Sequence, residues 1–135
     1  MKARDARPNT ERLSQLLAAE ADIVLATVFG SIVDGTQRVD SDLDVAVLTN
    51  RPLTAERKQQ LIKLLAMESG RPVDLVDLRT AGIVALRSAL LRGEKLFCRD
   101  NSAYAALLSH ALLDVADFLP YRERLLRQRR LAWTS

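Results

Sequence analysis

The sequence predicts an α/β or α+β fold in which helices flank a small mixed β-sheet. Three apolar runs of strand length, rich in Val, Ile and Leu, lie at residues 23–29, 43–48 and 73–78. Segments near them carry apolar residues three and four positions apart, a spacing typical of helices packed on a core. With 135 residues and no internal repeat or interdomain linker, the chain is expected to form a single domain over residues 1–135.

The first part of the chain is expected to contain a helix, a strand and a turn. Thr10 would cap a helix over residues 11–19, whose Leu residues share one face. The strand at 23–29 runs into Gly30-Ser31, which predicts the turn out of the strand. A short helix over residues 31–34 would follow and end at a glycine.

The middle of the chain predicts a strand, a long helix and another strand. Residues 43–48 form the second apolar run. Thr54 would cap a helix that extends to about Ser69 and ends at Gly70. The third strand is expected at residues 73–78.

Beyond the third strand, the pattern predicts two further helices and an edge strand. Thr80 would cap a helix over residues 81–91, and residues 95–98 have the content of a short edge strand. The last helix is expected to start at Asn101 or Ser102.

The two ends of the chain differ from the middle. Residues 1–9 are polar and are expected to form a loose N-terminus, whereas 101–135 is expected to be a helical segment with a basic tail. Pro120 would interrupt that segment. Its apolar residues at helical spacing are Ala105, Leu108, Ala111 (or Leu112), Val115 and Phe118.

Composition excludes several classes of protein. Hydrophobic residues at 48% and charged residues at 27% are typical of soluble globular domains, and no apolar run has the length of a membrane span. Cys98 is the only cysteine, which excludes an internal disulfide and fits a reducing cytoplasm. The net charge of the chain is +3, and residues 121–135 alone carry +4, so the rest of the chain is near −1. Nucleic acid is therefore not expected as a direct substrate.

Two carboxylates at the start of the second strand carry the clearest chemical signal. Asp42 and Asp44 are two positions apart, so the pleat of a strand points them to the same side. Such like charges repel unless a positive charge lies between them, and Mg²⁺ with bound phosphate would supply it. Asp74 and Asp77 in the third strand differ by an odd number of positions, so only one of them can join this pair. Asp74 is the predicted third ligand.

The Gly30-Ser31 turn completes a constellation suited to phosphoryl chemistry. Free N–H groups at a helix start favour phosphate, and glycine lets the backbone approach a triphosphate closely. Asp42, Asp44 and Asp74 would then hold two Mg²⁺ ions for an in-line displacement at phosphorus. Asp74 would also accept the proton of the attacking hydroxyl.

Simpler interpretations apply to several of these residues taken singly. Gly30-Ser31 read alone is only a turn, and Asp42 only a residue at a strand end. An EF-hand is excluded, because the sixth loop position is Val45 and the twelfth is Arg51. His110 lies in a helical pattern and is interpreted as a packing or surface residue rather than a ligand. The Arg-rich stretch 122–130 is either a solvated helix face or a surface for a partner.

The spacing Gly30-Ser31, ten residues, then Asp42-Leu43-Asp44 resembles the signature of the DNA polymerase β nucleotidyltransferase superfamily, most closely its minimal nucleotidyltransferase branch. The resemblance implies a polymerase β-like fold and an antitoxin paired with a HEPN-domain ribonuclease toxin. It implies transfer of AMP from ATP to a tyrosine hydroxyl of that toxin, with Mg²⁺ as cofactor. Gly30 and Ser31 would hold the triphosphate, Asp42 and Asp44 the metals, and Asp74 would be the third carboxylate.

One departure from the resemblance concerns the phosphate-binding loop. Many relatives read Gly-Ser-Arg-Ala-Arg-Gly, whereas this chain reads Gly-Ser-Ile-Val-Asp-Gly over residues 30–35, with Arg38 the candidate substitute. Two other functions remain open: a toxin-binding module without catalysis, and an enzyme that modifies a small molecule such as an aminoglycoside. The acceptor residue, the number of AMP units, the base preference and the oligomeric state are left open by the sequence.

Overall fold

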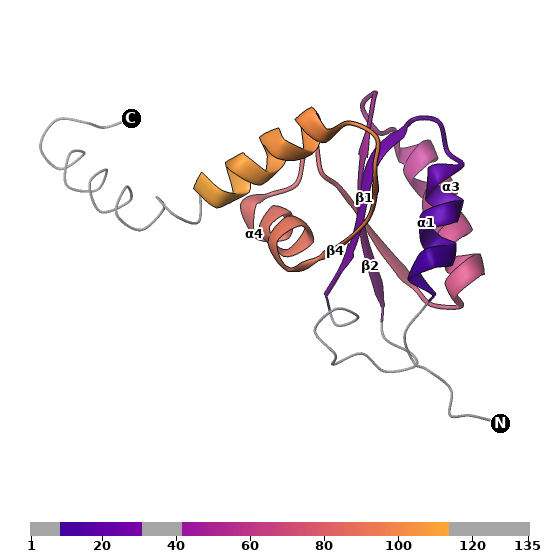
Figure 1. The fold of residues 1–135 in the computed structure, drawn as a ribbon. Coiled ribbons are helices and arrows are strands. Elements are labelled where there is room, and N and C mark those ends of the chain that lie inside the picture. The colour runs from indigo at the N-terminus through magenta and orange to yellow at the C-terminus, as the bar shows by residue number, and fades with distance from the viewer. Residues whose placement is uncertain (1–8, 31–41, 114–135) are drawn as a thin grey trace, which may run out of the picture.

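The computed structural model describes residues 9–30 and 42–113, which form a mixed sheet between two layers of helices (Figure 1). The strand order is β3-β2-β1-β4, with β2 antiparallel to β1 and parallel to β3, and β4 antiparallel to β1. The predicted mixed sheet flanked by helices is therefore confirmed. The strands are β1 (Ile23–Phe29), β2 (Leu43–Thr49), β3 (Val73–Asp77) and β4 (Glu94–Cys98).

The helices divide between the two faces of the sheet. In Figure 1, α1 (Thr10–Ala18) and α3 (Ala55–Ser69) cover one face. The other face carries α4 (Ile83–Arg87), the π-helical turn η1 (Ser88–Arg92) that continues it, and a helix over residues 101–113. Because α3 joins two parallel neighbours, β2, α3 and β3 form one crossover unit.

Each helical layer encloses its own hydrophobic core. On the α1 and α3 face, Leu13, Leu17, Leu61 and Leu65 pack on the sheet, and all four are at most 1% exposed. On the α4 face, Phe29 of β1 and Ala46 of β2 belong to a second cluster of buried residues. That cluster comprises Leu25, Phe29, Ala46, Leu78, Leu86, Ala89, Leu90 and Ala111.

The strand and long-helix predictions are confirmed to within two residues. β1 has the predicted bounds, β2 extends one residue further to Thr49, and β3 ends at Asp77 rather than at residue 78. Thr54 caps α3 by accepting a hydrogen bond from the Arg57 N–H at 3.0 Å. Gly70 ends α3 in the left-handed region at φ 70°.

Three predictions about helix ends and faces are wrong. Asn9, not Thr10, caps α1, because its side chain accepts a hydrogen bond from the Arg12 N–H. Thr80 does not cap the fourth helix, which begins after Gly82. In the 101–113 helix, Leu108 and Ala111 pack in the core as predicted, but Ala105 is exposed and Tyr104 and Leu107 pack there in its place.

Several predictions fall outside the described residues. They concern the loose end at 1–9 (except residue 9), Ser31 with the helix at 31–34, and the C-terminal segment from residue 114 onward, including Pro120. The single domain over residues 1–135 stays a prediction for the same reason. In the described ranges, no helix has both the length and the apolar content needed to cross a bilayer.

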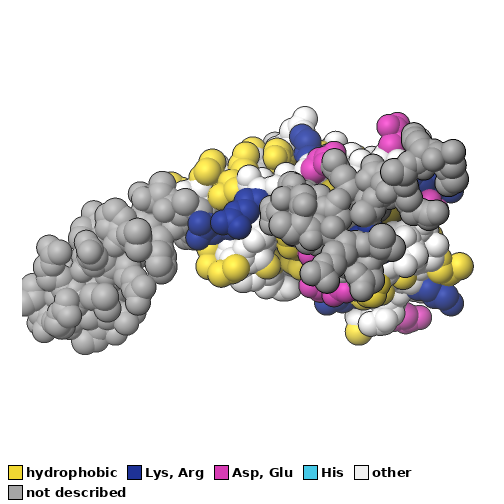
Figure 2. Space-filling view, turned by 90° about the horizontal axis from the view of Figure 1, so that it is seen from below, with side chains coloured by type: hydrophobic (Ala, Val, Ile, Leu, Met, Phe, Trp, Pro, Cys, Tyr) yellow, Lys and Arg dark blue, Asp and Glu magenta, His cyan; other side chains and the backbone are white. Residues whose placement is uncertain are grey.

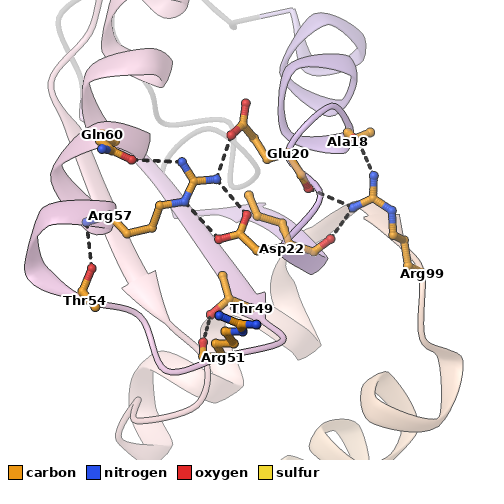
Figure 3. Close-up of polar contacts among 10 residues, drawn as sticks. Ala18, Glu20, Asp22, Thr49, Arg51, Thr54, Arg57, Gln60 and Arg99 are labelled. Atoms are coloured by element: carbon orange, nitrogen blue, oxygen red, sulfur yellow. Dashed lines mark hydrogen bonds and ion pairs between the residues drawn. The ribbon is translucent and has the colours of Figure 1, made fainter.

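An arginine cluster fixes the end of the sheet at which β1 begins (Figure 3). The Arg57 guanidinium, on α3, donates to both carboxylate oxygens of Asp22 at 3.0 and 2.7 Å, and to Glu20 at 2.7 Å. Arg99 donates to the backbone carbonyls of Ala18, Glu20 and Ile23. These contacts tie α1, β1, α3 and the end of β4 together at one end of the sheet.

The Arg57 contact predicts a pH dependence of stability. The hydrogen bond from Arg57 lowers the pKa of Asp22 below 3.8 despite some desolvation, so its contribution is present above about pH 4 and is lost as pH falls through the lowered pKa. We expect Asp22→Asn to cost about 1 kcal/mol at pH 7, after allowance for partial solvent exposure. The difference in free energy of unfolding should shrink below pH 4 in urea titrations.

A matched control is available on α3. Glu68 pairs with Arg12 at 3.5 Å with a half-exposed arginine side chain, so Glu68→Gln should change the unfolding free energy little at either pH. An Asp22→Asn effect that is equally small at pH 7, or that grows on acidification, would contradict the role assigned to Arg57.

Candidate active site

The opposite end of the sheet brings two of the predicted carboxylates side by side. Asp44 of β2 is the register partner of Asp74 of β3 in the parallel pair. Neighbouring strands lie ~4.8 Å apart and registered residues share a face, so the two carboxylates emerge together. Asp44 alternates with Ala46, which packs in the core on the α4 face, so the pair opens toward that face. The prediction that Asp74 lies beside Asp44 is therefore confirmed in its geometry.

The parity argument for Asp77 is also confirmed. Asp77 pairs in register with Val47, whose side chain packs on the α1 and α3 face of the sheet. Its carboxylate accepts a hydrogen bond from the Arg79 N–H at 2.9 Å, which closes the turn after β3. Asp77 thus has a local structural role away from the Asp44–Asp74 pair.

Asp42 lies next to this pair, one residue before β2. It is exposed, as is Asp74, while Asp44 is half-buried. Burial raises the pKa of Asp44, and the negative charges of Asp74 and Asp42 raise that pKa further. The carboxylates are therefore close enough to repel one another.

Gly30 places the end of β1 directly against Asp44. Phe29 is the register partner of Asp44, and the next residue, Gly30, has φ 81°. A Cβ at Gly30 would lie 2.1 Å from Asp44 Oδ2, a separation no real side chain tolerates. Only glycine therefore permits both the backbone conformation and the position of this carboxylate. Ser31 lies outside the described residues, so its predicted place in the site is untested.

The charge of the carboxylates is unbalanced in the described part of the chain. Arg12 and Arg57 form ion pairs with Glu68, Glu20 and Asp22, and neither arginine contacts Asp42, Asp44 or Asp74. Lys and Arg side chains form a short band on the side of the molecule where α4 lies (Figure 2). The site thus has the acidic character that a cation requires.

The donor set fits Mg²⁺ only together with phosphate. Within the described ranges, no three His, Cys, Asp or Glu side chains are gathered closely enough to hold a metal ion by themselves. Mg²⁺ in nucleotide sites takes one or two protein carboxylates and completes its shell with phosphate oxygens and water. Asp44 and its register partner Asp74, with Asp42 two residues before Asp44, supply the one or two carboxylates that such a site needs. His110 is exposed on the 101–113 helix, which agrees with a surface residue.

Comparison with known families agrees with this arrangement. Residues 11–102, more than half of the chain, match the family described as polymerase beta, nucleotidyltransferase. The chain belongs to the polymerase β nucleotidyltransferase family. The matched residues include the whole sheet, the Gly30 turn and all three carboxylates.

Individual relatives of this chain are found among both sequences and solved structures. The protein adenylyltransferase MntA of Shewanella oneidensis is 38% identical over 73 residues, which cover 54% of this chain and 52% of MntA. The match thus spans about half the length of that curated relative. A chain in a crystal structure of a toxin–antitoxin with AMP-PNP superposes with a TM-score of 0.72 at 27% identity, over 88% of this chain and 96% of the other. A mutant of the toxin–antitoxin MntA–HpeT gives 0.72 at 26% identity, over 90% and 97%.

The contact between Gly30 and Asp44 was not predicted from the sequence. The glycine was interpreted as part of the turn out of the strand and as a means for the backbone to approach phosphate. The strand pairing adds a second requirement, because it places the residue after β1 against the second residue of β2. The signal was present in the sequence, since a glycine directly after a strand indicates a close backbone approach.

The Gly30 contact generates a testable prediction with an internal control. Gly30→Ala incurs the cost of a positive φ, about 1 kcal/mol or more, and also displaces the Asp44 carboxylate. Gly70→Ala has a similar φ of 70° but meets nothing within 4 Å. We expect both variants to lose stability in thermal unfolding, and Gly30→Ala alone to lose binding of Mg²⁺ with ATP by at least tenfold in calorimetry. Equal ATP binding by the two variants would contradict the role of Gly30.

Proposed function

We propose that this nucleotidyltransferase is an antitoxin that transfers AMP from ATP to a tyrosine hydroxyl of a cognate HEPN toxin and so neutralises it. The proposal extends to this chain the adenylyltransferase activity for which MntA is named and the toxin–antitoxin assembly of the structural neighbours with 26–27% identity. The single observation that carries it is the registered pair Asp44–Asp74 held against the Gly30 bend.

The proposed roles of the residues follow from their positions. Asp42 and Asp44 would hold Mg²⁺ and Asp74 would complete the carboxylate set. The Gly30 bend, with Ser31, would seat the triphosphate. Bound Mg²⁺, as two ions, would supply positive charge that stabilises the attacking and leaving oxygens. A triphosphate in this place would lie over the end of the sheet, on the α4 face toward which the pair opens.

In the proposed transfer step, AMP passes from ATP to the acceptor hydroxyl. The acceptor hydroxyl oxygen forms a bond to the α-phosphorus of ATP, and the bond from that phosphorus to the bridging oxygen breaks, so that pyrophosphate leaves. The hydroxyl proton passes to the carboxylate of Asp74, from which it exchanges with water. The exposure of Asp74 fits this role, since a protein hydroxyl and solvent can both reach it.

The test compares four carboxylate variants in the purified chain with its toxin. Asp42→Asn, Asp44→Asn and Asp74→Asn should each reduce labelling of the toxin from α-phosphate-labelled ATP by at least 100-fold, because each removes charge that the metal-bound nucleotide needs. Asp77→Asn is the control. It leaves an Oδ1 acceptor for the Arg79 N–H and lies on the other face, so labelling should stay within twofold of wild type.

The outcomes separate the remaining alternatives. Undiminished labelling in the Asp44→Asn variant would exclude the catalytic site proposed here. Full neutralisation of the toxin by all three variants would favour a binding module without catalysis. Labelling of an aminoglycoside rather than of the toxin would favour the small-molecule enzyme. The same assay in the presence of a chelator would measure whether labelling depends on Mg²⁺.

A further inference from the structure

The π-helical turn η1 places two arginines on one face of the α4 layer. Residues five apart in an ordinary α-helix point about 140° from each other, since each residue turns by ~100°. The wider π-helical turn, with its i→i+5 hydrogen bonds, brings such residues close to the same direction. Arg87 is the last residue of α4 and Arg92 the last residue of η1, so the widened turn lies between them.

These arginines line a small pocket. Its volume is about 130 Å³, and its lining residues are Val84, Arg87, Ser88 and Arg92. Both arginines are exposed, and no ion pair found within the described ranges involves either one. A pocket with two guanidinium groups and one hydroxyl has the donors that phosphate oxygens accept from.

The pocket lies at the same end of the sheet as the carboxylates. Val28 of β1 pairs with Glu94, two residues after Arg92, and Phe29 pairs with Asp44 on the other side of β1. β2 and β4 flank β1, so the start of β4 lies about two strand spacings, ~10 Å, from Asp44 of β2 and about three, ~14 Å, from Asp74 of β3. The face is also shared, because Ala89 and Leu90 of η1 pack with Phe29 and Ala46.

Gly93 allows the chain to leave η1 close to β1. A Cβ at Gly93 would lie 2.2 Å from the carbonyl oxygen of Ala89 and 3.0 Å from that of Val28. The glycine therefore lets the chain leave η1 tightly against β1 and enter β4. The position of Arg92 is thus fixed by the packing of η1 on the strand that leads to Gly30.

We propose that Arg87, Ser88 and Arg92 form a binding subsite for the terminal phosphates of the nucleotide donor. This inference rests on the proposed function for the identity of the donor. It is supported by the loop sequence, since residues 30–35 contain no arginine and Arg38 is the only arginine between residues 30 and 41 to neutralise the charge of a triphosphate. The subsite would supply that charge from a different element.

The size of the pocket favours phosphate over a protein segment. Sites for drug-sized ligands usually measure ~300 Å³ or more, and this pocket is under half of that. A larger hollow of about 300 Å³ lies between α1 and β4, but Glu11 and Glu94 line it together with Lys95, so its charge does not select an anion. The arginine pocket is the better match for a phosphate group.

The experiment measures binding of inorganic tripolyphosphate with Mg²⁺ by calorimetry, in the absence of any acceptor. Arg87→Gln and Arg92→Gln should each weaken binding about tenfold and the double variant about 100-fold, since each removes a charge-assisted contact. Arg87→Lys and Arg92→Lys should recover part of the loss. Lys63→Gln, an exposed residue of α3 on the other face, is the control and should bind as wild type.

A second measurement separates this inference from the proposed function. In the toxin-labelling assay, the double variant should raise KM for ATP and leave KM for the toxin unchanged. Weaker tripolyphosphate binding in a chain that labels no acceptor would support the subsite and reject the adenylyltransferase. Unchanged tripolyphosphate affinity in the double variant would overturn the subsite. The subsite would also be overturned if the substitutions changed only the affinity for an RNA oligonucleotide, or only KM for the toxin.

Discussion

The repulsion between carboxylates on adjacent strands is the constraint on which this structure's chemistry depends. The parallel register of β2 and β3 holds Asp44 beside Asp74, and the chain cannot separate them without losing strand pairing. Burial and the two neighbouring negative charges raise the pKa of Asp44. A carboxyl group whose pKa is raised on folding makes the folded state less stable as pH rises through that pKa. At neutral pH the protein therefore carries a stability cost at this site, which a bound cation would offset.

The rest of the fold keeps that arrangement in place. One helical layer, α1 and α3, forms a fully buried core on the face away from Asp44. The Arg57 contacts hold the end of the sheet that is far from the carboxylates. At the carboxylate end, strand pairing holds Asp44 in place, and Gly30 leaves room for the Asp44 carboxylate because glycine has no Cβ. The rigid scaffold lies behind the carboxylates, while the α4 face in front of them carries the exposed arginines. Functional residues in proteins are commonly positioned in this way by a rigid, well-packed scaffold.

The sequence predicted the elements whose signals are local. Thr54 and Gly70 mark the ends of α3 by cap chemistry, and the apolar run at 23–29 has no competing helical spacing. The odd spacing of Asp74 and Asp77 established that only one of them can join Asp44, and the register of β2 with β3 shows that it is Asp74. The roles assigned to Asp42, Asp44, Asp74, Gly30 and Ser31 remain predictions that the proposed variants test.

Features that depend on distant packing were not predicted. Asn9 and Thr10 are both good caps, and their order along the chain alone does not decide between them. The residue before α4 is Gly82 and not the predicted cap Thr80. Nothing in the local sequence indicated the π-helical turn, which depends on how η1 packs against β1. The collision avoided at Gly30 likewise depends on the β1–β2 register. For the π-helical turn and for Gly30, the deciding contact joins residues that only the folded chain brings together.

The central claim is that the carboxylates of β2 and β3 hold a cation together with a nucleotide. Its most direct measurement is the thermal unfolding of wild type and Asp44→Asn, each with and without Mg²⁺ and a non-hydrolysable ATP analogue. Without ligand, Asp44→Asn should unfold at a higher temperature than wild type at neutral pH, because the repulsion is reduced. With both ligands, wild type should gain several degrees and the variant little. An equal gain in the two proteins, or a variant that is less stable without ligand, would contradict the account.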